Sequence, residues 1–577
     1  MIIMKKIFYF LTIFSAVLMV SCDEDILDRT PLDEISEPEF WKTTSDLELY
    51  ANSFYNKLPG WSGVGFGSAQ MPDVGTDLGL GTGISSRLNG SQGIPNSSTN
   101  SLWSWDEVRQ ANYFISNMSK AEGLEAEINQ YKGEGYFFRA YFYYDLLKKY
   151  GDLPIYEEYF DNLDTDELYK ARSPRNEVAD FILADLDSAI SLLKPKSDLA
   201  APRVNKEAAQ LLKATIALYE GTWEKYHSGT DFGVTGSDGT IYLQQAADAA
   251  KDLIDGGTRT LHPSYGSLFN QTNLSTNTEV ILWREYDYVG LGNSFGNDAQ
   301  INWPNNFSYS LDAIQSYLAL DGLPTSVSTL TTDDKELANI ETNRDPRLAE
   351  TLMVPGDVVV VNIDGSMLYW TEPTVGQSVG AYESQKYRIT ELDPSTNDFS
   401  RNTAKILMRY AEALLIYAEA KAELGTITQA DLDLTINKLR ERAGFDFSAN
   451  PTAKLTLNPV TDPNWPDYGH SISPLLQEIR RERTVELINE GFRLDDLMRW
   501  GAHKLFVGKR PKGAYYETLI YNTASNLDVD ENNYLDPYSV DLPDGYNFNP
   551  DRDYLLAIPT EELVLNPNLT QNPGWED

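Results

Sequence analysis

Blocks of helical periodicity are the feature of this sequence that most limits its possible folds. In each block apolar residues recur every three or four positions, so that they would line one face of an α-helix. Turn-forming or small residues separate one block from the next. The pattern predicts a mostly α-helical protein, with blocks at residues 36–58, 134–151, 174–194, 206–226, 242–257, 403–424, 432–443 and 473–501.

Two of these blocks predict a helical hairpin. Residues 403–424 are followed, after a short turn, by apolar residues from Leu432 to Ala443 at a spacing of four, three and four. The block at 242–257 carries small residues where neighbouring helices would approach closely. Gly151 predicts a left-handed end for the helix at 134–151. The paired blocks resemble degenerate tetratricopeptide units, although no strict repeat period runs through the chain.

Three long stretches between the helices predict an irregular, loop-rich face. Residues 59–101 are rich in Gly, Ser, Asn and Pro and far exceed the usual length of a connection, which is typical of functional loops. Residues 260–400 and 505–577 mix turn residues with short strand-like runs, such as VVVVNI at 358–363. We expect these three insertions to belong to one domain that covers residues 36–577.

The N-terminus has the order of charged, apolar and small residues that marks a secretory signal. Two lysines precede a mostly apolar run at 7–20, and Ser21 then precedes Cys22, the only cysteine of the chain. The run is shorter than the ~20 residues of a membrane-spanning helix. Cleavage before a cysteine is the arrangement of a bacterial lipoprotein signal, in which the thiol takes a diacylglycerol group. We therefore predict a signal peptide at 1–21, a lipid anchor on Cys22 and an acidic tether at 22–35.

Charge and composition exclude several classes of partner and site. The formal net charge of −39 repels the phosphate backbone, so nucleic acid is not an expected partner. One cysteine allows no internal disulfide and no thiolate zinc site, and the four histidines show no ligand-like spacing. We therefore expect no metal and no cofactor.

The block at 473–501 carries a charge on an apolar stripe. Ser473 can cap a helix with a proline at its first position, and glycines at 491 and 501 can each end a helical stretch. Arg483 shares a face with apolar residues, so it needs a partner. We predict that it pairs with Glu486 or Glu490 in a largely buried network. This structural interpretation outweighs the alternative that these carboxylates perform acid–base catalysis.

Several segments, in order along the chain, carry a family resemblance. They are SCDEDILDRTPLDEIS, FFRAYFYYDLLKKYGDLPI, YLALDGLP, NRDPRL, RYAEALLIYAEAKAELG, INKLRERAGF, RRERTVELINEGFRLDDLMRWG and IPTEELVLNPNLTQNPGW. Together they resemble the RagB/SusD family of Bacteroidetes nutrient-uptake outer-membrane lipoproteins. The resemblance implies a SusD-like fold of tetratricopeptide-like helical hairpins, a loop-rich ligand-binding face and a few short strands. It also implies a SusC-like TonB-dependent transporter as partner and a location at the cell surface of the outer membrane. The three acids after Cys22 then resemble a surface-export signal.

The candidate ligand residues are aromatic, amide and carboxylate side chains. Sugars have apolar C–H faces and hydroxyl rims, so they suit aromatic platforms flanked by such polar groups. The richest segment is 282–310, and the resemblance places the loop after the first helix beside it. The predicted binding residues are Trp283, Tyr286, Tyr288, Asn302, Trp303, Asn306, Trp61, Asp73, Asp77 and Trp103, with Trp303 first among them because an Asn-Trp-Pro turn would leave its ring outward.

Motifs for catalysis and calcium binding are incomplete. GQSVG at 376–380 fits a nucleophile elbow around Ser378, but the flanking residues do not predict the strand and helix that the elbow needs. Residues 528–539 begin like a calcium loop and lack its glycine and its final glutamate. We predict a glycan-binding surface lipoprotein that delivers oligosaccharide to its transporter and is not an enzyme. A surface glycoside hydrolase and a helical protein-binding scaffold without a small ligand stay open as alternatives.

Overall fold

The computed structural model of the protein describes most of the chain after the N-terminus. The predicted signal peptide, Cys22 and the acidic tether lie outside the described residues. So do four predicted ligand residues, Tyr288, Asn302, Trp303 and Asn306. The described ranges are 40–61, 72–160, 165–200, 202–287, 307–330, 332–333, 335–373, 378–392, 403–516 and 527–576.

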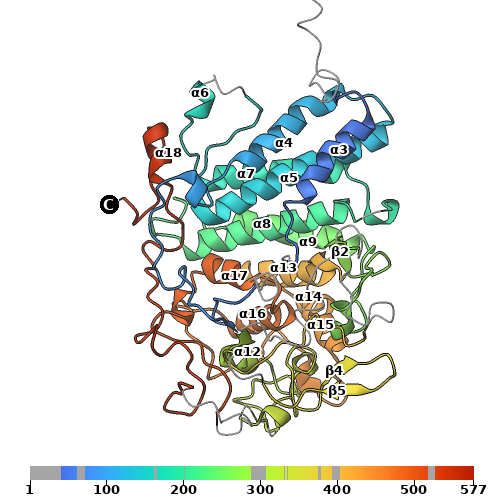
Figure 1. The fold of residues 1–577 in the computed structure, drawn as a ribbon, viewed down its shortest axis with the longest axis vertical. Helices are drawn as coiled ribbons and strands as arrows, with labels where there is room; N and C mark the ends of the chain where they lie inside the picture. The colour runs from blue at the N-terminus through green and yellow to red at the C-terminus, as the bar shows by residue number, and fades with distance from the viewer. Residues whose placement is uncertain are drawn as a thin grey trace, which may run out of the picture.

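The long helices pack side by side, largely in the order of the sequence (Figure 1). The helical blocks predict all of them except α4 and the first turns of α5. Helices α3 and α4 lie against α5, α5 against α7, α7 against α8, and α8 against α9. Helix α9 packs against α13, and α13 against α16. The bounds are α3 Thr44–Tyr55, α4 Asp106–Asn117, α5 Glu125–Tyr150, α7 Arg175–Leu192, α8 Lys206–Tyr226, α9 Thr240–Asp255, α13 Tyr410–Glu423 and α16 Pro474–Glu486.

Shorter elements connect and flank this helical stack. They include the helices α6 Thr165–Leu168, α10 Tyr265–Leu268, α12 Leu311–Gln315, α14 Gln429–Leu434, α15 Ile436–Ala443, α17 Arg493–Arg499 and α18 Thr560–Leu565. Single turns of 3₁₀-helix lie at Ser98–Asn100, Met118–Lys120, Lys196–Asp198, Leu337–Asn339, Pro346–Leu348, Pro451–Ala453 and His503–Leu505. No helix in the described ranges combines the length and the apolar composition that a membrane crossing requires.

The described strands form two-stranded antiparallel sheets. Strand β1 pairs with β3, β2 with β6, and β4 with β5. The predicted strand at 358–363 is confirmed as β4. The bounds are β1 Gly79–Leu80, β2 Val280–Arg284, β3 Ser308–Tyr309, β4 Val358–Val361, β5 Met367–Tyr369 and β6 Lys405–Arg409.

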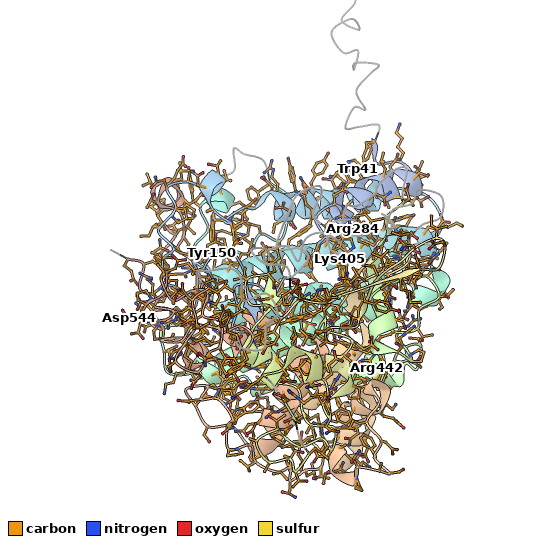
Figure 2. The ribbon with its side chains drawn as sticks, turned by 60° about the horizontal axis from the view of Figure 1, so that its bottom comes forward. Trp41, Tyr150, Arg284, Lys405, Arg442 and Asp544 are labelled. Atoms are coloured by element: carbon orange, nitrogen blue, oxygen red, sulfur yellow. The ribbon has the colours of Figure 1, made fainter. Side chains whose placement is uncertain are left out.

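The prediction of one helix over 403–424 was wrong at its start. Residues Lys405–Arg409 are strand β6, and helix α13 begins only at Tyr410. The backbone of β6 pairs with the buried strand β2, with Arg284 opposite Lys405 at one end of the sheet (Figure 2). This ladder satisfies backbone groups of β2 that burial would otherwise leave unpaired, so tertiary pairing overrides the helical pattern. The predicted hairpin is retained, because α13 packs against α14 and α15.

Glycines and alanines let the helices approach closely. A Cβ atom on Gly135 of α5 would lie 2.7 Å from Cδ1 of Phe114 on α4, and one on Gly133 would lie 2.7 Å from Cγ of Leu193. Such distances are below van der Waals contact, so only glycine fits. Helix α9 buries its alanines against α8, as predicted for the block at 242–257. Helix α5 ends at Tyr150, and Gly151 follows it as the predicted C-cap. Its φ of +71° is positive, but its ψ of −111° lies outside the predicted left-handed helical region.

For the block at 473–501, the predicted start at Ser473 and end at Gly501 are confirmed, whereas the first helix ends at Glu486, before the predicted Gly491. The Ser473 hydroxyl accepts a hydrogen bond from the N–H of Leu476 at 3.2 Å, and Pro474 is the first residue of α16. The block contains two helices rather than one. Gly491 and Gly501, with φ of +90° and +59°, follow α16 and α17 respectively.

Buried ion pairs tie α16 to segments that are distant in the sequence. Glu486 accepts hydrogen bonds from Arg347 at 3.0 Å and from Arg409 at 2.7 Å, and it also pairs with Arg442. Glu482 accepts one from Arg347 at 2.6 Å. All of these side chains are buried. Removal of one member of such a network leaves an uncompensated charge, at a cost of about 3–5 kcal/mol.

Arg483 belongs to a buried ion pair, as predicted, but its predicted partner was wrong. Its Nε donates to the carboxylate of Asp496 on α17, at 2.9 and 3.1 Å. Glu486 and Glu490 instead accept hydrogen bonds from Arg409. The turn between α16 and α17 places Asp496 beside Arg483, and the periodicity of a single helix does not reveal this contact.

Candidate functional site

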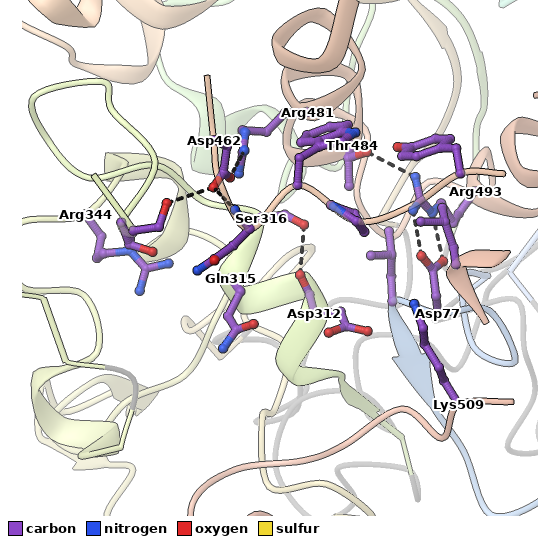
Figure 3. A pocket seen from close by; sticks show the side chains of 18 of the residues that line it. Asp77, Asp312, Gln315, Ser316, Arg344, Asp462, Arg481, Thr484, Arg493 and Lys509 are labelled. Carbon is purple, nitrogen blue, oxygen red and sulfur yellow. Dashed lines mark hydrogen bonds and ion pairs between the residues drawn. The ribbon is translucent and has the colours of Figure 1, made fainter. Parts of the chain in front are cut away.

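A pocket of about 440 Å³ lies between α12 and the segment that precedes α16 (Figure 3). Its lining is mainly polar, and it includes the predicted ligand residue Asp77. We call it the α12 pocket. The residues that carry the argument below are Asp77, Asp312, Asp462, Trp465, Tyr468, Arg481, Thr484, Arg493 and Lys509.

The loop before β1 is held to α17 by two carboxylates. Asp77 accepts hydrogen bonds from Nε and Nη2 of Arg493, at 2.8 and 2.6 Å. Asp73 accepts one from the N–H of Asn489 at 2.6 Å. Burial raises the pKa of Asp73 to about 6, against the opposing effect of the N–H groups that it accepts. Both predicted aspartates therefore fix the loop, and Asp77 reaches the pocket already paired.

A serine links this loop to α12. The Ser310 hydroxyl donates to the carbonyl of Asp77 at 2.6 Å and accepts from the N–H of Ala313 at 3.2 Å. It therefore caps the N-terminus of α12. Asp312, the second residue of this helix, lines the pocket. Strand β3 directly precedes Ser310 and pairs with β1. This wall of the pocket is therefore built from the β1–β3 sheet and the capped first turn of α12.

Two aromatic rings form the opposite wall. Trp465 and Tyr468 are parallel, with ring centroids 5.7 Å apart and an interplanar angle of 2°. The Arg481 guanidinium lies 5.1 Å from the centre of the Trp465 ring and pairs with Asp462 at 2.5 Å. Trp465 Nε1 is buried without a hydrogen-bond partner among the described residues. The Trp465 side chain is half-buried, so part of its ring borders the pocket, whereas Tyr468 behind it is only 3% exposed.

Salt bridges set the protonation states of this wall. Burial would raise the pKa of Asp462, but hydrogen bonds from Ser326 and Asn464 and the charge of Arg481 outweigh it and hold the pKa below its usual value. Burial likewise opposes the charged form of Arg493, and its pair with Asp77 outweighs this effect and raises the pKa of Arg493. These groups stay charged at neutral pH.

One carboxylate and one ammonium in the pocket have no such partner. Asp312 and Lys509 both line the pocket, both are exposed, and neither makes a side-chain hydrogen bond or ion pair within the described part of the chain. The paired groups cancel in charge, and so do these two. The further charged residue of the lining, Arg344, is 4% exposed and donates to the carbonyls of Ile314 and Tyr317. The pocket therefore offers one exposed hydrogen-bond acceptor, one exposed donor and a half-buried indole to a ligand.

Three of the predicted aromatic residues lie together in a different place. Trp61, Trp283 and Tyr286 belong to one buried cluster and are 6–7% exposed. The Tyr286 hydroxyl accepts from the N–H of Trp61 at 2.7 Å, and Trp61 Nε1 donates to the carbonyl of Thr403 at 3.0 Å. In the described structure these rings anchor the start of the long loop to the β2–β6 sheet. They do not line the α12 pocket.

The last described candidate, Trp103, lines a second pocket. It is 2% exposed and contacts Tyr150 and Trp105, with ring centroids 4.8 and 5.4 Å away. The structure therefore distributes the described candidates over three places rather than one face. The role of each as a ligand residue stays a prediction.

Sequence reasoning missed Trp465, although the signal was present. The segment Asn-Trp-Pro at 464–466 repeats the motif at 302–304 that selected Trp303. The same argument, a tryptophan held in a turn between an amide and a proline, applies to both positions. Arg493 and Lys509 carried no comparable signal, because their place in the pocket depends on how distant segments meet.

The weaker motifs have structural explanations. The described residues that follow Ser378 form no helix, and its hydroxyl accepts from the N–H of Ala381 at 3.0 Å, as in a turn. In the segment that begins like a calcium loop, Asp530 accepts from the N–H groups of Asn532 and Tyr534, and Asp536 pairs with Arg510. Among the residues that the structure describes, no group of three or more His, Cys, Asp or Glu could hold a metal ion.

Comparison with known proteins identifies the family. A model of the SusD family matches residues 266–575, which is more than half of the chain. The chain belongs to the SusD family. A second model, described as starch-binding and associating with the outer membrane, matches residues 88–218. The family resemblance seen in the sequence is therefore confirmed.

Relatives of this SusD-family chain match over nearly its whole length. It is 25% identical to SusD-like protein P2 of Formosa agariphila, over 96% of this chain and 97% of that protein. A SusD-like carbohydrate-binding protein from Bacteroides fragilis shares the fold, with a TM-score of 0.69 and 23% identity over 92% of this chain and all of the other. A laminarin-binding SusD-like protein aligns over the same shares, with a TM-score of 0.56 and 19% identity. The predicted SusD-like, mostly helical fold is thus confirmed.

Proposed function

We propose that this protein is an outer-membrane surface lipoprotein that binds an oligosaccharide in the α12 pocket and delivers it to a TonB-dependent transporter, without catalysis of its own. The observation that carries the proposal is that the half-buried Trp465, supported by the parallel ring of the buried Tyr468, lines the same pocket as the unpaired groups Asp312 and Lys509. A sugar ring can place its C–H face on the indole while its hydroxyl groups donate to the carboxylate and accept from the ammonium. Names of relatives, which include a carbohydrate-binding and a laminarin-binding protein, support the ligand class.

The paired charges of the pocket argue against a cationic glycan. Asp77 is neutralised by Arg493 and Asp462 by Arg481, so neither can bind a cationic sugar without losing an existing pair. The same pairing argues against glycoside hydrolysis, which needs two carboxyl groups free to act on the glycosidic bond. Only Asp312 among these three carboxylates is unpaired.

A direct test is calorimetry with an oligosaccharide selected from a panel of neutral and acidic glycans that includes laminarin oligosaccharides. We expect Trp465→Ala to weaken binding by about fivefold to a hundredfold, because a stacked ring contributes about 1–3 kcal/mol in the comparable case of nucleobases. Asp312→Asn and Lys509→Met, both at exposed positions, should weaken it without lowering the melting temperature. Tyr369→Ala is the matched control, because Tyr369 is 51% exposed on β5 and does not line the pocket.

The outcomes separate the alternatives. Unchanged affinity in all three pocket variants would place the ligand elsewhere. Release of reducing ends from the bound glycan would indicate a hydrolase. Retention of the transporter partner without binding of any glycan in the panel would indicate a protein-binding scaffold. Copurification of the transporter from native outer membranes, probed with the same variants, tests delivery separately from capture.

A further inference from the structure

A second pocket, of about 230 Å³, lies on the helical part of the molecule. It is bounded by α4, the segment 154–160, α6 and α18, away from α12 (Figure 1). We call it the α4 pocket. The side chains that carry the argument are Trp105, Asp106, Tyr156, Tyr159, Phe160 and Glu562.

Two polar residues of the lining, Arg109 and Asn112, hold the aromatic segment of this pocket in place. Arg109 donates to the Tyr159 hydroxyl at 3.1 Å and to the carbonyl of Phe160 at 3.4 Å, and its guanidinium lies 4.7 Å from the centre of the Tyr159 ring. Asn112 donates to the carbonyl of Tyr156 at 2.8 Å and accepts from the buried Arg139 at 2.9 Å. The aromatic segment is thus fixed before any ligand arrives, which lowers the entropy cost of binding.

The indole of Trp105 is the main platform in the α4 pocket. It is half-buried, and it directly precedes the first residue of α4. Trp103, Tyr143 and Tyr156 meet it at interplanar angles of 80°, 71° and 83°. None of these three neighbours stacks parallel on the indole. Tyr159, at the opening, is 38% exposed.

Three carboxylates surround these rings. Asp106, Glu158 and Glu562 line the pocket, and none of their carboxylates makes an ion pair or a hydrogen bond with a described residue. In the α12 pocket, by contrast, two of the three carboxylates are consumed by arginines. The α4 pocket therefore presents free hydrogen-bond acceptors around an aromatic platform and repels an anionic ligand.

We propose that the α4 pocket is a second carbohydrate site, which takes one uncharged sugar residue of a glycan. The ring stacks on Trp105, and its hydroxyl groups donate to the free carboxylates. The volume fits a single sugar ring rather than a larger ligand, since drug-sized ligands occupy about 300–1,000 Å³. The inference rests on the proposed function, because it assigns a second site for the same class of ligand.

Calorimetry and a double variant test this inference. The probe is the shortest neutral oligosaccharide of the panel that the wild-type protein binds, and a uronate oligosaccharide of equal length is the charged comparison. We expect two sugar sites in the wild-type protein, one after Trp465→Ala, one after Trp105→Ala, and none after both. At the α4 pocket the affinity should fall at least tenfold with Trp105→Ala, and the uronate should bind there more weakly than the neutral probe.

Milder variants guard against a folding defect. If Trp105→Ala lowers the melting temperature, Tyr159→Ala, at an exposed position, and Glu562→Gln, which keeps the size of the side chain, should still weaken the same site. One site that Trp465→Ala abolishes and that all three α4-pocket variants leave unchanged would overturn this inference and leave the proposed function intact. Failure of every glycan to bind would overturn both. Loss of the transporter partner in Tyr159→Ala, with sugar binding unchanged, would overturn it in favour of a protein contact.

Discussion

His227, at the C-terminal end of α8, is a buried group that makes stability depend on pH. Its Nε2 hydrogen-bonds to the carbonyl of Met498 at 2.8 Å, and its ring stacks on Trp223 with centroids 4.1 Å apart. Burial lowers the pKa of His227 to about 3, more than the hydrogen bond raises it. The unfolded chain therefore binds a proton at this position below about pH 6.5, while the folded chain does not.

The lower pKa of His227 in the folded chain determines how stability changes with pH. The stabilisation from neutral His227 is fully present above pH 6.5 and is lost as the pH falls toward the folded pKa. Between pH 7 and pH 5 the free energy of unfolding should fall by about 2 kcal/mol more in the wild type than in His227→Gln. Urea unfolding of both proteins at a series of pH values measures these free energies. Both proteins keep the other titrating groups, so the contributions of those groups cancel in the difference between the two pH profiles. Parallel pH profiles would contradict the assignment.

Arg483 tests the energetic weight of the buried ion pairs. Its side chain is 6% exposed, and Arg483→Ala leaves Asp496 with Arg499 as its remaining partner. We expect the free energy of unfolding to fall by about 3 kcal/mol or more. Lys504→Ala is the control, since its pair with Asp467 is more than half exposed on both sides and should contribute less than about 1 kcal/mol. Equal effects of the two variants in urea unfolding would show that burial of the pair adds nothing.

At the scale of elements, close helix packing depends on single glycines. Alanine normally stabilises a helix interior by about 1 kcal/mol relative to glycine. In Gly135→Ala the new methyl group would lie 2.7 Å from Phe114, so α4 and α5 would have to separate. We expect a net loss of about 1–3 kcal/mol in thermal or urea unfolding. Ser188→Ala is the control, because the half-buried Ser188 of α7 donates only to the carbonyl of Ala184 in its own helix, and it should be neutral or slightly stabilising. A stabilised Gly135→Ala would show that the helices have room.

The same elements show how far sequence predicts this fold. Periodicity found most of the long helices because each buries one stripe against its neighbours, but it missed α4 and the first nine residues of α5. The cap at Ser473 and the glycine after α5 follow from local chemistry. Strand β6 was missed because its pairing with β2 joins residues more than a hundred positions apart. The partner of Arg483 and most of the α12 pocket depend on the same kind of distant contact. Trp465 is different, since a local motif marked it and the motif was applied at only one of its two positions.

At the scale of the whole molecule, the chain separates its predicted anchor from its folded body. Cys22 lies more than twenty residues before α3, which begins at Thr44 and is capped by Thr43. Both pockets lie in the folded body. With a net charge of −39, the protein has no electrostatic attraction to anionic headgroups, so attachment to a membrane would have to come from the lipid.

Cys22→Ala tests that separation. Each buried methylene of an acyl chain contributes about 0.8 kcal/mol, so loss of the lipid should release the protein from the outer membrane. In the native host we expect the variant to take up no labelled palmitate and to leave the membrane fraction or remain an unprocessed precursor. Ser21→Ala keeps a small residue before the cysteine and should be labelled and anchored like the wild type. A version that begins after Cys22 should keep the melting temperature and glycan affinity of the full chain, because the anchor and the pockets share no residue. Unchanged labelling and unchanged fractionation of Cys22→Ala would show that another feature attaches the protein.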